Sequence, residues 1–154
     1  MAIYIILILA VCVLDQMTKQ WAVVSLMEQG SVPVIDGVLH FTYLENRGAA
    51  FGMLADHRWI FMAASIAAII LLLVYFFTIK GKHHLLRTAL ALVVGGGIGN
   101  MFDRCLLGYV VDFIDVRLFS FWKWVFNIAD CAVCVGGALL VIAVLLEMKW
   151  ERAK

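Results

Sequence analysis

The feature that most constrains this chain is an apolar run over residues 59–79 that contains no charged side chain. At about 1.5 Å of rise per residue, a helix over this run is roughly 31 Å long, which is enough to cross the hydrocarbon core of a bilayer. The chain has 154 residues, of which 65% are hydrophobic and only 15% are charged. A soluble fold of this size would lack the polar side chains that cover a surface, so we expect an integral membrane protein.

Three further apolar segments predict membrane helices. Together with the first run they give four spans, at about residues 2–26, 59–79, 85–105 and 128–147, within a single domain over residues 1–154. The N-terminal segment has no basic start and no small-x-small cleavage pattern, so we interpret it as a membrane helix rather than a signal peptide. Gly95 and Gly99 lie one helical turn apart and favour close packing against another helix.

Charges between the spans predict the orientation of the chain. Lys80, Lys82 and Arg87 follow the second span with no acid among them. Basic segments favour the cytoplasm, which places both termini inside and the loops 27–58 and 106–127 outside. Residues 38–43 are β-branched and aromatic, and the aromatic run 118–126 suits the membrane–water interface. We therefore expect an all-α membrane protein in which four transmembrane helices carry a small extracytoplasmic β-sheet.

Polar side chains collect at the outer ends of the predicted spans, although a charged residue costs about 2.5–3.5 kcal/mol at the centre of a membrane helix. The set comprises Asp15, Lys19, Asn100, Asp103, Arg104, Asp112, Asn127 and Asp130. Two aspartates in a low-dielectric pocket share one proton, so one can activate water while the other protonates a scissile carbonyl. We therefore predict that Asp112 and Asp130 hydrolyse peptide bonds. This chemistry needs no metal or other cofactor, and the sequence contains no His-Glu-x-x-His pattern.

Several of these residues also have simpler interpretations. Two neighbouring pairs suit structural ion pairing: Asp15 with Lys19, and Asp115 with Arg117 in a solvated loop. Asp103 next to Arg104 suits either orientation of the site or local pairing. Among them, Arg104 is the one that we expect to contact a substrate.

Two other functions compete with peptide hydrolysis. A transporter or channel subunit would also carry membrane carboxylates, but its charges would be spread through the bilayer or paired in two halves. A non-catalytic assembly factor would not need Asp112 and Asp130 together. The net charge of +1 argues against a nucleic-acid partner.

Four motifs occur in order along the chain. They are residues 15–19 (Asp-Gln-Met-Thr-Lys), 46–52 (Asn-Arg-Gly-Ala-Ala-Phe-Gly), 99–104 (Gly-Asn-Met-Phe-Asp-Arg) with 111–113 (Val-Asp-Phe), and 126–130 (Phe-Asn-Ile-Ala-Asp). In this order they resemble the bacterial lipoprotein signal peptidases, the type II signal peptidases of the inner membrane. The resemblance covers essentially the whole chain. Met101, Phe102 and Cys131 depart from the usual residues, and none of them has a chemical role.

The resemblance implies an aspartic endopeptidase that acts within the membrane, with four helices and an outer sheet cradle. Its substrates would be prolipoproteins whose lipobox cysteine carries diacylglycerol, cut on the N-terminal side of that cysteine. Asp112 and Asp130 would be the catalytic dyad. The implied substrate-binding residues are Asn46, Gly48, Asn100, Arg104 and Asn127, and the supporting residues are Asp15, Lys19 and Asp103. We expect a monomer in the bacterial cytoplasmic membrane, in contact with membrane lipids, with its active site near the outer leaflet.

Overall fold

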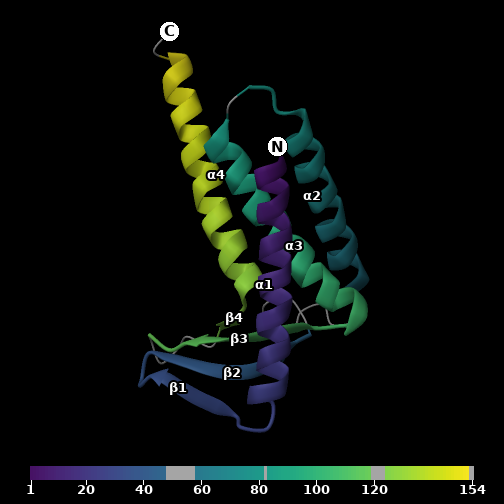
Figure 1. The fold of residues 1–154 in the computed structure, drawn as a ribbon, viewed down its shortest axis with the longest axis vertical. Helices are drawn as coiled ribbons and strands as arrows, with labels where there is room; N and C mark the ends of the chain where they lie inside the picture. Colours follow the sequence, from purple (N-terminus) through teal and green to yellow (C-terminus); the bar gives the residue numbers. More distant parts are fainter. Residues whose placement is uncertain (48–57, 82, 119–123, 153–154) are drawn as a thin grey trace.

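Four helices form the body of the molecule in the computed structural model, which describes residues 1–47, 58–81, 83–118 and 124–152. The helices are α1 (Ala2–Leu26), α2 (Arg58–Thr78), α3 (His84–Leu106) and α4 (Ile128–Arg152). α3 packs against each of the other three. Figure 1 shows the N-terminus and the far end of α4 at one end of this bundle, and a small sheet across the other end.

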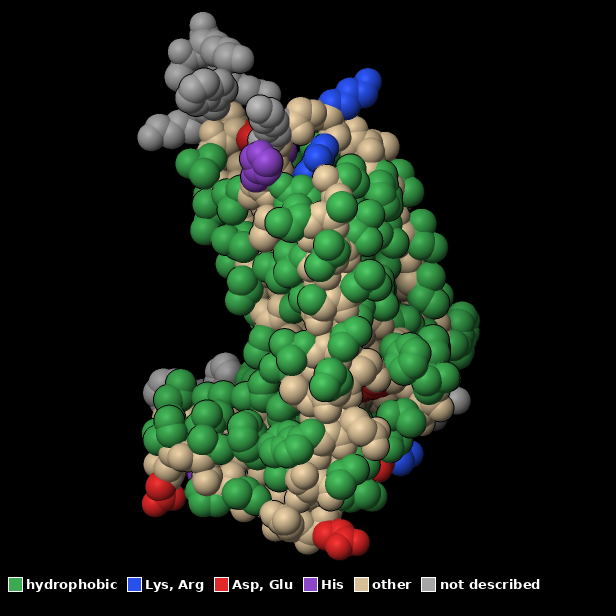
Figure 2. Space-filling view, in the orientation of Figure 1, with side chains coloured by type: hydrophobic (Ala, Val, Ile, Leu, Met, Phe, Trp, Pro, Cys, Tyr) green, Lys and Arg blue, Asp and Glu red, His purple; other side chains and the backbone are tan. Residues whose placement is uncertain are grey.

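Length and composition suit these helices to a membrane. Among the described residues, α1, α3 and residues Ile128–Glu147 of α4 are long and apolar enough to span a bilayer, and α2 contains the shorter apolar segment Met62–Thr78. Their outward faces carry exposed apolar side chains such as Ile3, Leu71 and Leu145, and Figure 2 shows hydrophobic side chains over most of the bundle. In lipid these side chains need no polar cover, and each helix satisfies its own backbone hydrogen bonds.

Glycines of α3 allow its neighbours to approach closely. A Cβ atom on Gly95 would lie 3.0 Å from Val11 Cβ of α1, and one on Gly96 would overlap the backbone oxygen of Ala129 of α4. A Cβ on Gly99 would lie 2.6 Å from Asp15 Oδ2. The prediction that Gly95 and Gly99 serve helix contact is confirmed, because side chains at these positions would push α1 away from α3.

Within the described residues the sheet has four antiparallel strands, in the order β1 (Ser31–Ile35), β2 (Leu39–Asn46), β3 (Val110–Val116) and β4 (Val125–Phe126). Gly37, at φ 71°, lies in the turn between β1 and β2, where a left-handed backbone favours glycine. Pro33 lies in the edge strand β1, where its missing N–H leaves no unpaired partner inside the sheet.

The end of α1 attaches the sheet to the bundle. Ala22 and Leu26 of α1 are buried against Val111 and Phe113 of β3. Trp21 adds edge-on contacts with the rings of Phe41 and Phe113, at centroid distances of 5.2 and 6.0 Å. The predicted combination of apolar helices and a small sheet is confirmed. Most of the aromatic run 118–126 lies outside the described residues.

Candidate active site

Five polar residues meet where the helix bundle joins the sheet. They come from separate elements: Asn46 ends β2, Asn100 lies in α3, Asp112 in β3, Asn127 directly before α4, and Asp130 in the first turn of α4. Only the tertiary fold brings these four elements together, because they are far apart along the chain.

Asn127 and Asp130 form a reciprocal cap at the start of α4. Asn127 Oδ1 accepts a 2.8 Å hydrogen bond from the backbone N–H of Asp130, and Asp130 Oδ2 accepts a 3.2 Å bond from the backbone N–H of Asn127. This is the arrangement of a capping box, which satisfies N–H groups that have no partner inside the helix. The helix therefore begins at Ile128, and both side chains are held in fixed positions.

Asp112 is buried in β3, with 1% of its surface exposed. It accepts hydrogen bonds from Asn46 Nδ2 at 2.9 Å and from Asn127 Nδ2 at 2.6 Å. Asn46 pairs with Val110 across the β2–β3 ladder. Because side chains alternate along a strand, Val110 and Asp112 share a face of the sheet, which brings Asn46 next to Asp112.

Asn127 contacts both carboxylates. Its Nδ2 donates to Asp112, while its backbone N–H and side-chain oxygen are bonded to Asp130. Asn100 completes the group, because its Nδ2 donates to Asp130 Oδ1 at 2.7 Å and its Oδ1 lies 3.1 Å from Asn127 Nδ2. The two aspartates are thus joined through amides rather than through a direct bond.

The end of β2 is fixed beside this group. Arg47 donates to Glu45 Oε2 at 2.6 Å, and its guanidinium lies 5.3 Å from the ring centroid of Tyr109. The hydrogen bond from Arg47 lowers the pKa of Glu45. These contacts tie β2 to the residue before β3 and so hold Asn46 near Asp112.

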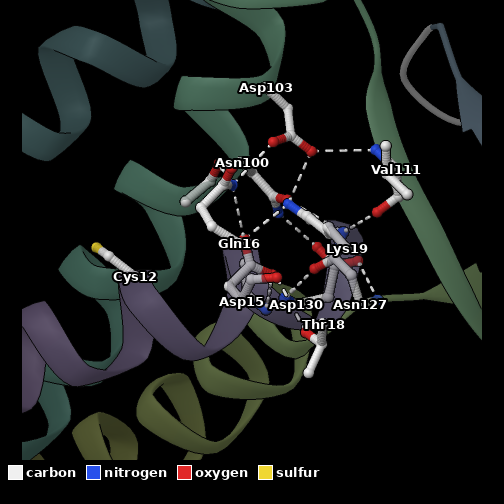
Figure 3. Close-up of polar contacts among 12 residues, drawn as sticks. Cys12, Asp15, Gln16, Thr18, Lys19, Asn100, Asp103, Val111, Asn127 and Asp130 are labelled. Atoms are coloured by element: carbon white, nitrogen blue, oxygen red, sulfur yellow. Dashed lines mark hydrogen bonds and ion pairs between the residues drawn. The ribbon is translucent and has the colours of Figure 1, made fainter. Parts of the chain in front are cut away.

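A buried ionic cluster lies next to Asn100, Asn127 and Asp130 (Figure 3). Lys19 Nζ is 2.8 Å from Asp15 Oδ2, 2.9 Å from Asp103 Oδ2 and 2.9 Å from Asn100 Oδ1. The three charged residues are at most 3% exposed. The prediction that Asp15 and Lys19 pair is confirmed. Of the two alternatives for Asp103, local pairing with Arg104 is wrong, because the packing of α1 on α3 places Lys19 against Asp103 instead.

The two acids of this cluster each hold the residue that precedes a site aspartate. Asp15 Oδ1 accepts a 2.8 Å bond from the backbone N–H of Ala129, next to Asp130. Asp103 Oδ2 accepts a 3.1 Å bond from the backbone N–H of Val111, next to Asp112. α1 and α3 therefore set the positions of α4 and β3 relative to one another.

Gln16 also belongs to this cluster, although the sequence did not predict a role for it. Its Nε2 donates to Asp103 Oδ1 at 2.8 Å and lies 3.3 Å from both Asp15 Oδ2 and the backbone oxygen of Gly99. Its position between Asp15 and Lys19 was the available signal, since three polar residues on neighbouring faces of an apolar helix need partners.

Burial and charge shift the protonation of Asp112. Burial raises the pKa of Asp112 to about 6, from an ordinary value of 3.8, and the nearby carboxylate of Asp130 acts in the same direction. Hydrogen bonds from Asn46 and Asn127 oppose this shift. The arrangement can therefore hold a proton on Asp112 up to about pH 6, beside a second carboxylate.

Of the two remaining predicted substrate-binding residues, the structure describes only Arg104. Arg104 Nη1 donates to the backbone oxygen of Asn100 at 3.3 Å, at the end of α3. Gly48 lies outside the described residues. Within the described part of the chain, no group of three His, Cys, Asp or Glu side chains is placed to hold a metal ion.

The predicted pairing of Asp115 with Arg117 is confirmed, but the prediction that the pair lies in a solvated loop is wrong. Asp115 lies buried in β3, where it accepts hydrogen bonds from Arg117 and Thr42. Burial alone would raise the pKa of Asp115, but the hydrogen bonds from Arg117 and Thr42 outweigh it and leave the pKa lowered. Asp115 is therefore a charged structural residue of the sheet.

Comparison with known proteins agrees with this arrangement. Residues 7–146 match the family model of signal peptidase (SPase) II. The lipoprotein signal peptidase of Clostridioides difficile (strain 630) is 43% identical over 143 residues, which cover 93% of this chain and 95% of that protein. The lipoprotein signal peptidase of Halothermothrix orenii is 38% identical over 149 residues, which cover 97% of this chain and 96% of that protein.

Solved structures show the same fold. A bacterial membrane enzyme determined by the in meso method at 2.3 Å resolution superposes with a TM-score of 0.89 and 32% identity, over 100% of this chain and 94% of that one. A second such enzyme, at 1.9 Å, gives a TM-score of 0.84 and 35% identity over 94% of each chain. The chain is therefore a multi-pass membrane protein that belongs to the signal peptidase II family.

Proposed function

We propose that this protein is an aspartic endopeptidase that removes signal peptides from diacylglyceryl-modified prolipoproteins. The cut would fall on the N-terminal side of the lipobox cysteine. The observation that supports this best is Asn127, which contacts Asp112 and Asp130 at once although they come from different elements. Family membership supports the removal of lipoprotein signal peptides, and the paired carboxylates support the aspartic mechanism.

In this mechanism Asp112 carries the shared proton, consistent with its raised pKa. Asp130 takes a proton from water, and the water oxygen attacks the scissile carbonyl carbon while Asp112 protonates the carbonyl oxygen. When the tetrahedral intermediate collapses, the C–N bond breaks and the leaving amine takes a proton from Asp130. Asp112 recovers its proton from the intermediate, so both groups return to their starting state.

The amides around the dyad orient it and bind the substrate backbone in this proposal. Asn100 and Asn127 hold the carboxylates of Asp130 and Asp112 through bonds of 2.7 and 2.6 Å. Asn46 donates to Asp112 from the other side. Arg104 and Gly48 would contact the substrate, and for Arg104 this requires its guanidinium to turn from its contact with Asn100.

The proposed orientation places the sheet and the dyad at the outer leaflet and both termini in the cytoplasm. Figure 1 shows the sheet at one end of the bundle and both chain ends at the other. Basic residues near the end that carries both termini favour a cytoplasmic location for that end. Figure 2 shows the sheet projecting sideways from the bundle, which leaves a hollowed, mainly hydrophobic face on which a signal-peptide helix would fit.

The deciding experiment is incubation of the purified protein with a prolipoprotein in two forms, with and without the diacylglyceryl group on cysteine. Mass spectrometry of the products should show a cut before the modified cysteine and much slower cleavage of the unmodified form. A third substrate, unmodified but tethered to the membrane by another anchor, should also be cut slowly. Equal cleavage of the lipidated and the tethered forms would show a general membrane aspartic peptidase instead.

A further inference from the structure

A cavity of about 760 Å³ lies at the end of the bundle that is remote from Asp112 and Asp130. It is formed by the first turns of α1 and the start of α3, and its lining includes Tyr4, Leu7, Ala10, His84 and Arg87. Figure 1 places this region beside the N-terminus, at the opposite end from the sheet. In Figure 2, basic, histidine and acidic side chains lie at this end, while the bundle below them is hydrophobic; the acid Glu147 is paired with His83.

Arg87 brings a positive charge to this cavity. Its Nη2 donates to the backbone oxygen of Ile79 at 2.8 Å, which holds the guanidinium in place. Within the part of the chain that the structure describes, its buried Nε has no hydrogen-bond partner and no ion pair includes Arg87. A guanidinium that lines a largely apolar cavity and has no carboxylate partner favours an anion beside it.

His84 provides a second donor at the same cavity. The hydroxyl of buried Tyr4 lies 2.7 Å from His84 Nδ1. When Tyr4 donates this bond, the proton of the neutral ring is on Nε2, which is then a donor to a ligand. The helix α3 begins at His84 with no side-chain cap and no acid in its first turn among the described residues, so its dipole adds positive potential there.

The wall on the α1 side is apolar. Ile3, Ile6, Leu7 and Ala10 line it, and Ile3 and Ile6 are 70% and 63% exposed. These side chains belong to a helix that is long and apolar enough to span a membrane. A ligand that matches the whole cavity therefore has an anionic head and a hydrocarbon tail.

We propose that this cavity binds one anionic phospholipid from the surrounding leaflet. The Arg87 guanidinium and His84 Nε2 donate to the phosphate oxygens, and one acyl chain lies along Ile3, Ile6 and Ala10. The charges favour a headgroup with net negative charge over a zwitterionic one, because the quaternary ammonium of the latter would face Arg87. This site is separate from the proposed peptidase site and does not depend on it.

The test uses the purified full chain in a non-ionic detergent, with lipid binding followed by native mass spectrometry. The probes are dioleoylphosphatidylglycerol, dioleoylphosphatidylcholine and inorganic phosphate. We expect one phosphatidylglycerol to bind at least about tenfold more tightly than phosphatidylcholine. Arg87→Gln should remove this preference, while Lys80→Gln, which deletes an exposed charge at the same end outside the cavity lining, should retain it.

Several outcomes would overturn the proposal. Unchanged selectivity in Arg87→Gln, or an equal loss in Lys80→Gln, would show a diffuse surface effect. Displacement of the lipid by inorganic phosphate at equal concentration would show a site for free phosphate. Ala10→Phe fills part of the cavity along its apolar wall and changes no charge. It should weaken phosphatidylglycerol binding while thermal stability stays near that of the wild type. If Arg87→Gln does not fold, binding to Ala10→Phe as tight as to the wild type would refute the site.

Discussion

The side-chain nitrogen of Asn127 lies 2.6 Å from Asp112 Oδ1, and this bond connects the start of α4 to the middle of β3. The same residue caps α4 through Asp130. One asparagine therefore both stabilises a helix end and positions a carboxylate. These two roles can be separated by mutation, since each uses a different atom.

We expect Asn127→Ser to lower kcat by at least about tenfold while thermal stability stays near that of the wild type. Serine accepts the capping bond from the N–H of Asp130 but has no amide to donate to Asp112. Asn127→Ala removes both functions and should also cost about 1 kcal/mol of stability. The measurements are steady-state cleavage of a lipidated precursor and thermal unfolding in detergent. Equal loss of stability in both variants would show that the capping bond does not matter.

Removal of either site carboxylate should stop cleavage. Asp112→Asn and Asp130→Asn should each reduce kcat by about 10²–10⁴-fold, because each removes a proton-transfer group. Asp130→Asn keeps an oxygen that can accept the N–H of Asn127, so α4 should remain capped. Asp36→Asn is the matched control, since Asp36 is an exposed acid in the β1–β2 turn. Near-normal turnover of either purified site variant would refute the dyad.

Much of this site could be predicted from the sequence, because its residues break an apolar pattern. Asn127 and Asp130 have the spacing of a capping box, and Asp15 and Lys19 lie one turn apart on a membrane helix. Polar residues at such positions need partners. In the structure Lys19 pairs with Asp15 in the same helix, and Asn127 pairs with Asp130 in the first turn of α4.

The partners that come from different helices could not be predicted in this way. Lys19 contacts Asp103 because glycines of α3 allow α1 to pack at a short distance. No local sequence pattern predicts that distance. The balanced charges around Asp115 predict a solvated loop. Its burial depends instead on the pairing of β3 with β2, where it lies opposite His40.

Lys19 should matter to folding more than to chemistry. Lys19→Met leaves Asp15 and Asp103 buried without their cation, so we expect a loss of about 3–5 kcal/mol of stability. The double variant Lys19→Met with Asp103→Asn removes one of the two unpaired buried carboxylates, so it should recover part of the lost stability. Lys80→Met, at an exposed position, should change stability by less than about 0.5 kcal/mol. Thermal or denaturant unfolding in detergent gives the comparison. If the double variant were no more stable than Lys19→Met, electrostatic compensation within the cluster would be excluded.

The raised pKa of Asp112 predicts a specific dependence of stability on pH. Its pKa is about 6 in the folded protein and 3.8 in its ordinary state, so the folded state binds the proton more tightly than the unfolded one. Stability from this group is therefore fully present below pH 4 and is lost as the pH rises through 6. Asp112→Asn cannot ionise and lacks this dependence, so the wild type should gain stability relative to the variant as the pH falls from 7 to 4. The shift corresponds to at most about 3 kcal/mol. Melting temperatures of both proteins across this range measure the difference. If the relative stability of the two proteins did not change with pH, the Asp112 carboxyl would have an ordinary pKa. If the wild type instead lost stability relative to the variant toward acid pH, the pKa of Asp112 would be lowered, which would exclude Asp112 as the proton carrier.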